Sequence, residues 1–271
     1  MTAKELLTEI TAVLEKAEVF DSSYEAVEII KEICSSHPSL IREISDEQAF
    51  RIREIVKKRA EGYPLQYIFG KWEFYGYEFF VGDGVLIPRP ETELIVDIAC
   101  KELNKNSVFL DLCSGSGCIP ISVSKETGAK AYAVELYEKA FGYLKKNIKH
   151  NDADVTAVMG DALDNSHFNG ILFDSIFSNP PYLTKTEMDE LQKEVRYEPE
   201  TALFGGDDGL YFYNRLFRLW KDRLKDGGFF AVEVGDKQAE AVSRIIEAEG
   251  LKSEIIKDLQ GIGRVVIGRK I

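Results

Sequence analysis

The feature that most constrains the fold is a change of period at about residue 91. From there on, short apolar runs alternate with amphipathic segments of helical spacing. Strands are predicted over 107–113, 130–136, 154–160, 171–179, 227–235, 252–259 and 263–270, and helices over 90–103, 117–128, 137–151, 208–224 and 238–250. Strands that alternate with helices favour an α/β fold with a mostly parallel sheet covered on both faces. The last two strands have no helix between them, which predicts an antiparallel hairpin at one edge.

The chain before this region has a different pattern. Residues 1–70 place apolar residues at helical spacing in three segments. Residues 71–90 alternate aromatic side chains with glycines at the corners, as in a β-hairpin. We therefore predict a small helical domain over 1–70, a hairpin linker over 71–90 and an α/β domain over 91–271. The basic stretch 51–60 is interpreted as a solvated helix face, with a partner-docking patch as the alternative.

The net charge of −12 bears on the choice of partner. Proteins that hold a duplex through its phosphates usually carry a basic face, so an acidic chain makes a nucleic-acid substrate less expected. No apolar run reaches the roughly 20 residues that span a bilayer, and the first ten residues lack the features of a signal peptide. Four cysteines without C-x-x-C spacing indicate reduced thiols, and the three histidines show no metal-ligand spacing. These features predict a cytoplasmic protein without a membrane anchor or a metal.

The first predicted strand ends in a glycine-rich loop, DLCSGSGCIP (111–120). Such glycines allow a tight turn and close approach of a ligand, and the following helix offers its free N–H groups. Pro120 stands where a dinucleotide fingerprint has its third glycine, which argues against NAD. The next strands end near Glu135 and Asp161, and an acid after the second strand accepts hydrogen bonds from ribose hydroxyls in doubly wound folds. An adenosine-type ligand is predicted, with a packing turn and a helix-capping aspartate as the simpler alternatives.

The fourth predicted strand ends in SNPPY. Proline fixes its own φ and pushes the preceding residue into extended backbone, so Asn179 is held stiffly with Tyr182 three residues on. The segment is either a stiff turn or a device that holds an amide and a ring at the edge of the sheet where ligands bind. In the second interpretation, the Asn179 side-chain oxygen and the Pro180 carbonyl, which Pro181 helps to hold, accept the protons of a planar amino group. The Tyr182 ring then offers that group a flat face.

The combination of DLCSGSGCI with NPPY resembles S-adenosylmethionine-dependent methyltransferases that act on planar nitrogens. Together with the helical N-terminal region, the flanking segments IPRPETE (87–93) and YEPETALFGGDDGL (197–210) resemble the release-factor glutamine methyltransferases (the HemK/PrmC type) over the whole chain. In that family the loop usually has glycine where Cys113 stands, a small residue at Cys118, and aspartate rather than Glu135. The resemblance implies a Rossmann-like class I methyltransferase sheet of seven mostly parallel strands, with the helical domain recognising the substrate.

The resemblance also implies roles for particular residues. The cofactor would be S-adenosylmethionine, released as S-adenosylhomocysteine, and the substrate would be the side-chain amide nitrogen (N5) of the glutamine in the GGQ motif of peptide-chain release factors. Expected cofactor-binding residues are Asp111, Cys113, Ser114, Gly115, Ser116, Gly117, Glu135, Asp161, Ala162 and Asn179. Expected catalytic residues are Asn179, Pro180 and Tyr182; expected substrate-binding residues are Asn179, Pro180, Pro181, Tyr182, Arg89, Glu91 and Glu198, with Gly205 and Gly206 in a loop over the substrate. A monomer without metal or direct nucleic-acid substrate is expected.

Two other functions stay open on the sequence. An adenine-N6 methyltransferase acting on DNA or RNA would use the same NPPY logic, since adenine also presents a planar amino group once it is flipped out of a duplex. A non-catalytic module that binds a cofactor or a partner is the alternative from a different class, although it gives Asn179 and Tyr182 no evident role. A basic surface around the site would favour the first alternative, and failure to bind S-adenosylmethionine would favour the second.

Overall fold

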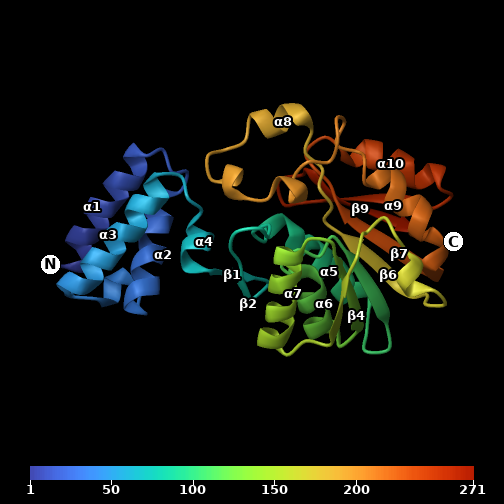
Figure 1. Ribbon diagram of the computed structural model, residues 1–271, viewed down its shortest axis with the longest axis horizontal. Helices are drawn as coiled ribbons and strands as arrows, with labels where there is room; N and C mark the ends of the chain where they lie inside the picture. The colour runs from blue at the N-terminus through green and yellow to red at the C-terminus, as the bar shows by residue number, and fades with distance from the viewer. The chain divides into compact units, whose positions relative to one another are not determined.

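The computed structural model describes all 271 residues, and they form two compact units (Figure 1). The first unit contains residues 1–70 and a short later segment, 192–197. The second contains residues 71–191 and 198–271. No helix in either unit is both long and apolar enough to cross a membrane.

The first unit is a helical bundle. Its elements are α1 (Ala3–Lys16), α2 (Ser22–Cys34), the 3₁₀ turn η1 (Pro38–Leu40), α3 (Asp46–Ala60), α4 (Leu65–Phe69) and η4 (Val195–Tyr197). Capping boxes start α1 at Thr2 and α3 at Ser45, where each side chain accepts an N–H that the helix leaves unpaired. The apolar stripes of α1, α2 and α3 meet in one core, which includes Leu6, Ile30 and Ile52. The helical periodicity of this region therefore reflects burial of one face of each helix.

Arg59 is the exception among the basic residues of 51–60, whose other members lie on the predicted solvated helix face. Its side chain is only 4% exposed. It donates to both carboxylate oxygens of Glu25 on α2, at 2.6 and 3.1 Å, and to Glu194 at 3.4 Å. A buried guanidinium needs such partners, because an unpaired charge in the interior is costly. The ion pair with Glu194 also attaches segment 192–197 to the helices of the first unit.

The second unit begins with the hairpin of β1 (Lys71–Phe74) and β2 (Tyr77–Phe80), which is shorter than the predicted 71–90. The main sheet has seven strands in the order β5-β4-β3-β6-β7-β9-β8. These are β3 (Val108–Leu112), β4 (Lys130–Glu135), β5 (Val155–Met159), β6 (Phe173–Ser178), β7 (Leu224–Glu233), β8 (Lys252–Lys257) and β9 (Gly263–Arg269). The first five pair in parallel, and β9 is antiparallel to both β7 and β8. The predicted α/β class, the seven strands and the edge hairpin are confirmed.

Helices cover both faces of this sheet (Figure 1). One face carries α5 (Glu93–Glu102), α6 (Cys118–Thr127) and α7 (Glu138–Asn151), and the other α9 (Tyr213–Trp220) and α10 (Ala239–Ala248). Each face has its own apolar core, with Phe109 and Phe177 in one and Phe230 and Trp220 in the other. The remaining elements are the short helix α8 (Lys185–Asp189) and the 3₁₀ turns η2 (Pro90–Thr92), η3 (Ser166–Phe168), η5 (Glu200–Ala202) and η6 (Lys221–Arg223).

The helix predicted over 208–224 is wrong at both ends. The α-helix covers only Tyr213–Trp220. Asp208 starts a turn instead of a helix, because its carboxylate accepts the N–H of Leu210 at 2.9 Å. At the other end the chain tightens into η6 before it enters β7. The apolar side chains of 210–212 thus belong to a loop, and this loop reaches the cavity described next.

The order of the strands fixes where a ligand can bind. After β3 the chain builds outward through β4 and β5, whereas β6 lies on the other side of β3. Loops that leave β3 and β6 at their carboxyl ends therefore diverge and leave a crevice, which is the usual ligand site of open α/β sheets. The glycine loop follows β3 and the SNPPY segment follows β6, so both reach this crevice.

Candidate active site

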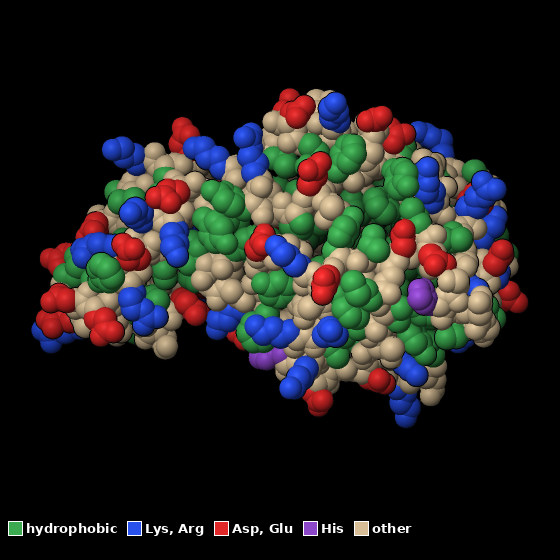
Figure 2. Space-filling model, in the orientation of Figure 1, with side chains coloured by type: hydrophobic (Ala, Val, Ile, Leu, Met, Phe, Trp, Pro, Cys, Tyr) green, Lys and Arg blue, Asp and Glu red, His purple; other side chains and the backbone are tan.

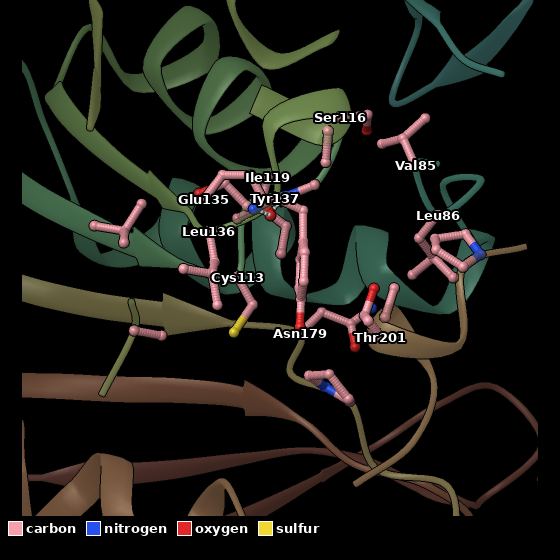
Figure 3. Close-up of a pocket in the computed structure, with 18 of the residues that line it drawn as sticks. Val85, Leu86, Cys113, Ser116, Ile119, Glu135, Leu136, Tyr137, Asn179 and Thr201 are labelled. Carbon is pink, nitrogen blue, oxygen red and sulfur yellow. Dashed lines mark hydrogen bonds between the residues drawn. The ribbon is translucent and has the colours of Figure 1, made fainter. Parts of the chain in front are cut away.

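A cavity of about 210 Å³ lies at the carboxyl edge of the sheet (Figure 3). Its walls come from the loops after β3, β4, β5 and β6, from residues 84–92 and from residues 199–212. Ten of the residues expected at the site line it: Arg89, Cys113, Ser114, Gly115, Ser116, Glu135, Asp161, Ala162, Asn179 and Pro181. Six do not: Glu91, Asp111, Gly117, Pro180, Tyr182 and Glu198. In Figure 3, Cys113, Glu135 and Asn179 lie around the same space although they come from three different strands.

The two glycines of the loop after β3 have different roles. Both have positive φ, 54° at Gly115 and 84° at Gly117. A Cβ on Gly115 would meet nothing within 4 Å, so this residue leaves its side of the loop open to a ligand. A Cβ on Gly117 would lie 2.6 Å from the Leu144 side chain, so this glycine allows α6 and α7 to pack closely. Cys113 also has positive φ, 60°, which is uncommon for a residue with a side chain.

Glu135 holds this loop in place. Its carboxylate is buried, and its two oxygens accept the N–H of Gly115 and of Tyr137, each at 2.8 Å. Burial raises the pKa of the Glu135 carboxyl, while the two backbone donors act in the opposite direction. Each carboxylate oxygen has a further lone pair, so Glu135 can support the loop and still accept a hydrogen bond from a ligand.

Asn147 supports the same loop from α7. Its side chain is completely buried and donates to the Ser116 carbonyl at 2.8 Å and to the Phe80 carbonyl at 3.0 Å. It also accepts the Phe80 N–H at 2.7 Å. The loop is therefore fixed to β2 through one amide. Asn147 continues the buried stripe of Ala140 and Leu144 at helical spacing, so the periodicity of 137–151 could have placed it on the inner face of the helix, although not its hydrogen-bond partners.

Asp111 has the most unusual carboxyl at this edge. It is completely buried, and neither carboxylate oxygen has a hydrogen-bond partner. Burial raises the pKa of the Asp111 carboxyl well above its ordinary value, and the nearby Glu135 adds to the shift. Buried polar groups are nearly always paired, so an unpaired carboxyl two residues before the cavity-lining Cys113 fits a ligand that supplies a donor or a positive charge nearby. Burial also raises the pKa of the Cys118 thiol to about 12, so this thiol stays protonated.

Asp161 and Ala162 follow β5. The Asp161 carboxylate accepts the Leu163 N–H at 2.8 Å, which forms a tight turn at the cavity wall. The Ala162 carbonyl accepts the indole N–H of Trp220 at 2.8 Å. These contacts orient the backbone of the turn toward the cavity without using the second oxygen of Asp161.

Asn179 is oriented by two buried residues that the sequence did not single out. Its Nδ2 donates to Thr92 Oγ1 at 3.2 Å, and Thr92 Oγ1 donates to Glu233 Oε2 at 2.5 Å. Thr92 and Glu233 are both only 2% exposed. Glu233 ends β7 within an apolar run, as Glu135 ends β4, and that shared position is the signal that could have revealed it.

The partly exposed Arg89 and the buried Glu198 form an ion pair beside the cavity. The other Glu198 oxygen accepts the Ile87 N–H at 3.0 Å. Glu198 thus fastens the segment after the 3₁₀ turn η4 to residues 87–89. Glu91 is exposed and forms no part of this pair.

Two glycines of YEPETALFGGDDGL, Gly205 and Gly209, pack against the backbone of NPPY. Leu183 and Phe204 form a parallel bridge, in which the Leu183 N–H and carbonyl bond to Leu203 and Gly205 at 2.8 Å. A Cβ on Gly205 would lie 2.5 Å from Tyr182 Cα and 2.6 Å from the Pro181 carbonyl oxygen. Gly205 is therefore needed for close backbone approach, and this segment buttresses NPPY.

Replacing Gly205 with alanine is expected to push the Pro181–Tyr182 backbone away and to lower turnover about 10- to 100-fold, because small displacements of positioning groups are costly. Gly142→Ala is the matched control: Gly142 lies on α7, and a Cβ there meets nothing within 4 Å. Steady-state kinetics and unfolding in urea should be measured for both variants. Equal turnover in the two would contradict the buttressing role of Gly205.

Comparison with known proteins places the chain in a family. A family model described as the PrmC N-terminal domain matches residues 5–70, and one described as conserved hypothetical protein 95 matches residues 93–204. A release factor glutamine methyltransferase of Thermodesulfovibrio yellowstonii is 38% identical over 236 residues, which is 84% of each chain. One of Clostridium botulinum is 36% identical over 284 residues, with full coverage of both chains. The chain belongs to the release factor glutamine methyltransferase family.

Solved structures agree with this family at the level of the fold. A methyltransferase from Pyrococcus furiosus matches with a TM-score of 0.58 at 22% identity, over 73% of this chain and 90% of that one. The hMettl16 catalytic domain, solved in complex with MAT2A 3′UTR hairpin 1, matches with a TM-score of 0.59 at 15% identity, over 89% and 90% of the two chains. This release factor glutamine methyltransferase family member thus has the sheet found in other methyltransferases.

Proposed function

We propose that this protein transfers a methyl group from S-adenosylmethionine to the side-chain amide nitrogen (N5) of the glutamine in the GGQ motif of peptide-chain release factors. The observation that carries the proposal is the placement of Asn179 in one cavity with the glycine loop and Glu135. The names of the relatives support the choice of substrate. The helical domain of residues 1–70 is proposed to recognise the release factor, with the protein acting as a monomer in the cytoplasm.

The residues in and behind the cavity wall suit an adenosyl cofactor whose amino-acid end carries an ammonium group. Glu135 has lone pairs available for ribose hydroxyls, and Gly115 leaves the loop open on the ligand side. The unpaired Asp111 carboxyl suits a nearby ammonium group. The turn at Asp161 and Ala162 would form the wall of the cavity beside the adenine. When bound, S-adenosylmethionine supplies an electrophilic methyl group on a sulfonium.

The chain's own contribution is to position a poor nucleophile. A carboxamide nitrogen has its lone pair delocalised into the carbonyl, so its geometry must be controlled. We propose that the glutamine NH₂ donates to Asn179 Oδ1 and to the Pro180 carbonyl. The Nδ2 of Asn179 donates to Thr92, and no protein group donates to Oδ1, which leaves this oxygen to accept from a substrate. Oxygen dipoles at this place stabilise the positive charge that grows on nitrogen during the transfer.

The remaining steps need no strongly basic side chain. The nitrogen becomes acidic as it gains the methyl group and can release a proton to water.

Tyr182 is half-buried, and its hydroxyl lies 3.4 Å from Glu233 Oε1, so the edge of the ring is fixed. We propose that its face supports the planar amide.

The adenine-N6 alternative has less support. On the face shown in Figure 2, Lys and Arg side chains are interspersed with Asp and Glu, and they form no single basic surface. The relatives that cover most of the chain are named for a protein substrate. The match to an RNA-bound methyltransferase is at 15% identity and bears on the fold alone.

The deciding experiment is transfer of a labelled methyl group. Wild-type protein with methyl-labelled S-adenosylmethionine should label a peptide-chain release factor, and a release factor with its GGQ glutamine replaced by alanine should remain unlabelled. Single-stranded and duplex DNA and RNA serve as alternative acceptors. Label in the substituted release factor, or in nucleic acid alone, would refute the proposed substrate, and absence of S-adenosylmethionine binding by calorimetry would refute enzymatic function.

A further inference from the structure

We infer that Thr92 and Glu233 form a hydrogen-bond relay that sets the orientation of the Asn179 amide and so makes the site select a substrate that donates N–H. Both are positioning residues, since they act through Asn179. This inference deepens the proposed function, and its kinetic part rests on that function.

The relay depends on the single hydrogen that the Thr92 hydroxyl can donate. A threonine hydroxyl donates one hydrogen bond and accepts up to two. Thr92 Oγ1 lies 2.5 Å from Glu233 Oε2 and 3.2 Å from Asn179 Nδ2. When the Glu233 carboxylate accepts the hydrogen bond from the Thr92 hydroxyl, Thr92 can only accept a hydrogen bond from Asn179. The amide must then present Nδ2 to Thr92 and leave Oδ1 for the cavity.

The opposite orientation would reverse the selectivity. If Glu233 carried a proton on the oxygen that faces Thr92, it could donate to Thr92, and the hydroxyl could turn its own proton toward Asn179 Oδ1. The Asn179 NH₂ would then face the cavity and oppose the NH₂ of a glutamine, because two donors cannot pair. It would instead suit an acceptor such as a carboxylate. The charge of Glu233 is thereby linked to the chemical class of substrate.

The surroundings keep this relay isolated from water. Thr92 and Glu233 are nearly fully buried, and the Thr92 N–H is held by the Arg89 carbonyl at 3.1 Å. Tyr213 donates its hydroxyl to the Glu233 backbone carbonyl at 2.7 Å, which fixes the end of β7. The ionisable groups that act electrostatically on Glu233 or are influenced by it are Arg89, Glu91, Cys118, Tyr182 and Tyr213.

Titration of Glu233 makes the relay observable. Burial raises the pKa of the Glu233 carboxyl to about 7. Turnover in the wild type should therefore fall as the pH is lowered through this range, as the proton allows the amide to reverse. This fall in turnover is the acidic limb of the pH profile. If Thr92 merely filled space, its replacement would leave the acidic limb in place.

The variant Thr92→Val keeps the shape and removes the hydroxyl, whereas Thr92→Ser keeps the hydroxyl. We expect kcat on the release factor to fall about 30-fold in Thr92→Val, the size of a lost hydrogen bond to a charged network, with KM and cofactor affinity within about twofold of wild type. Thr92→Ser should retain at least about a third of the wild-type kcat. The acidic limb of the pH profile should be present in wild type and Thr92→Ser and absent in Thr92→Val.

A second measurement needs no substrate. In ¹⁵N-labelled protein, the Asn179 side-chain NH₂ resonances should shift with pH around 7 in the wild type and should not do so in Thr92→Val. Wild type that fails to methylate the release factor would refute the proposed function and leave the resonance test to decide the relay. Wild-type kcat in Thr92→Val, equal losses in the valine and serine variants, or Asn179 resonances that ignore pH in the wild type would overturn the relay.

Discussion

Asn179→Ala is expected to fold normally, to bind S-adenosylmethionine with nearly wild-type affinity and to lose about 100- to 1000-fold in kcat, the usual cost of removing one preorganised transition-state dipole. The physical reason is that Asn179 Oδ1 has no protein donor and lies at the cavity, where the substrate amide must be held. Its removal leaves the glycine loop, Glu135 and the Glu135–Gly115 hydrogen bond intact. Cofactor binding should therefore persist while positioning of the nitrogen is lost.

The measurement is kcat from methyl transfer to the release factor, with calorimetry for the cofactor and thermal unfolding for the fold. Asn106→Ala provides a matched control, since Asn106 is exposed and lies in the loop before β3. Turnover of Asn179→Ala within about tenfold of the control would show that other groups orient the amide, because one preorganised dipole is usually worth more. A large loss of cofactor affinity in the same variant would instead assign Asn179 to cofactor binding.

The arrangement of the fold could be predicted because its signals are local. Alternation of apolar runs and amphipathic segments predicts the parallel sheet, and the missing helix between 252–259 and 263–270 predicts the edge hairpin. The errors occur where local composition and tertiary context disagree. Residues 210–212 continue the apolar pattern of the helix that follows, but Asp208 forms a turn with Leu210 and the chain enters the cavity wall.

The strand pattern predicts site residues where a residue stands at or next to a strand end, whereas Arg89 is expected only from the resemblance of IPRPETE. Glu135 ends β4, Asp161 and Asn179 follow β5 and β6, and parallel strands bring their carboxyl ends to one edge. The residues that support them come from elsewhere in the chain. Asn147 is 31 residues from the Ser116 carbonyl that it holds, and Thr92 is 87 residues from Asn179. No sequence period records such pairings, because they depend on which side chain happens to meet another in the folded core.

Glu233→Gln is expected to remove a pH dependence of stability that the wild type has in the absence of ligand. The Glu233 carboxyl has its pKa raised by burial from 4.5 to about 7 in the folded protein. The folded state therefore keeps its proton in a pH range where the unfolded state has released it. Stability is fully present below about pH 4.5 and is lost as the pH rises through about 7.

The size of the loss of stability follows from the pKa shift of the Glu233 carboxyl. One pKa unit corresponds to about 1.4 kcal/mol, so the shift from 4.5 to about 7 corresponds to a loss of about 3 kcal/mol across that window. Glutamine cannot ionise, so the free energy of unfolding of Glu233→Gln should lack this loss. The buried carboxyls of Asp111 and Glu135 shift stability in the same direction, but they are present in both proteins and cancel in the difference.

Urea unfolding of wild type, Glu233→Gln and the exposed control Glu254→Gln, each between pH 4.5 and 8, makes the comparison. The gap in free energy of unfolding, Glu233→Gln minus wild type, should become more positive by about 3 kcal/mol as the pH rises, because only the wild type loses stability. The free energy of unfolding of Glu254→Gln should run parallel to that of the wild type. A gap that stayed constant with pH would mean that Glu233 is ionised throughout. The Glu233 carboxylate would then always accept the hydrogen bond from Thr92, and the Asn179 amide would be fixed in one orientation at every pH at which the protein folds.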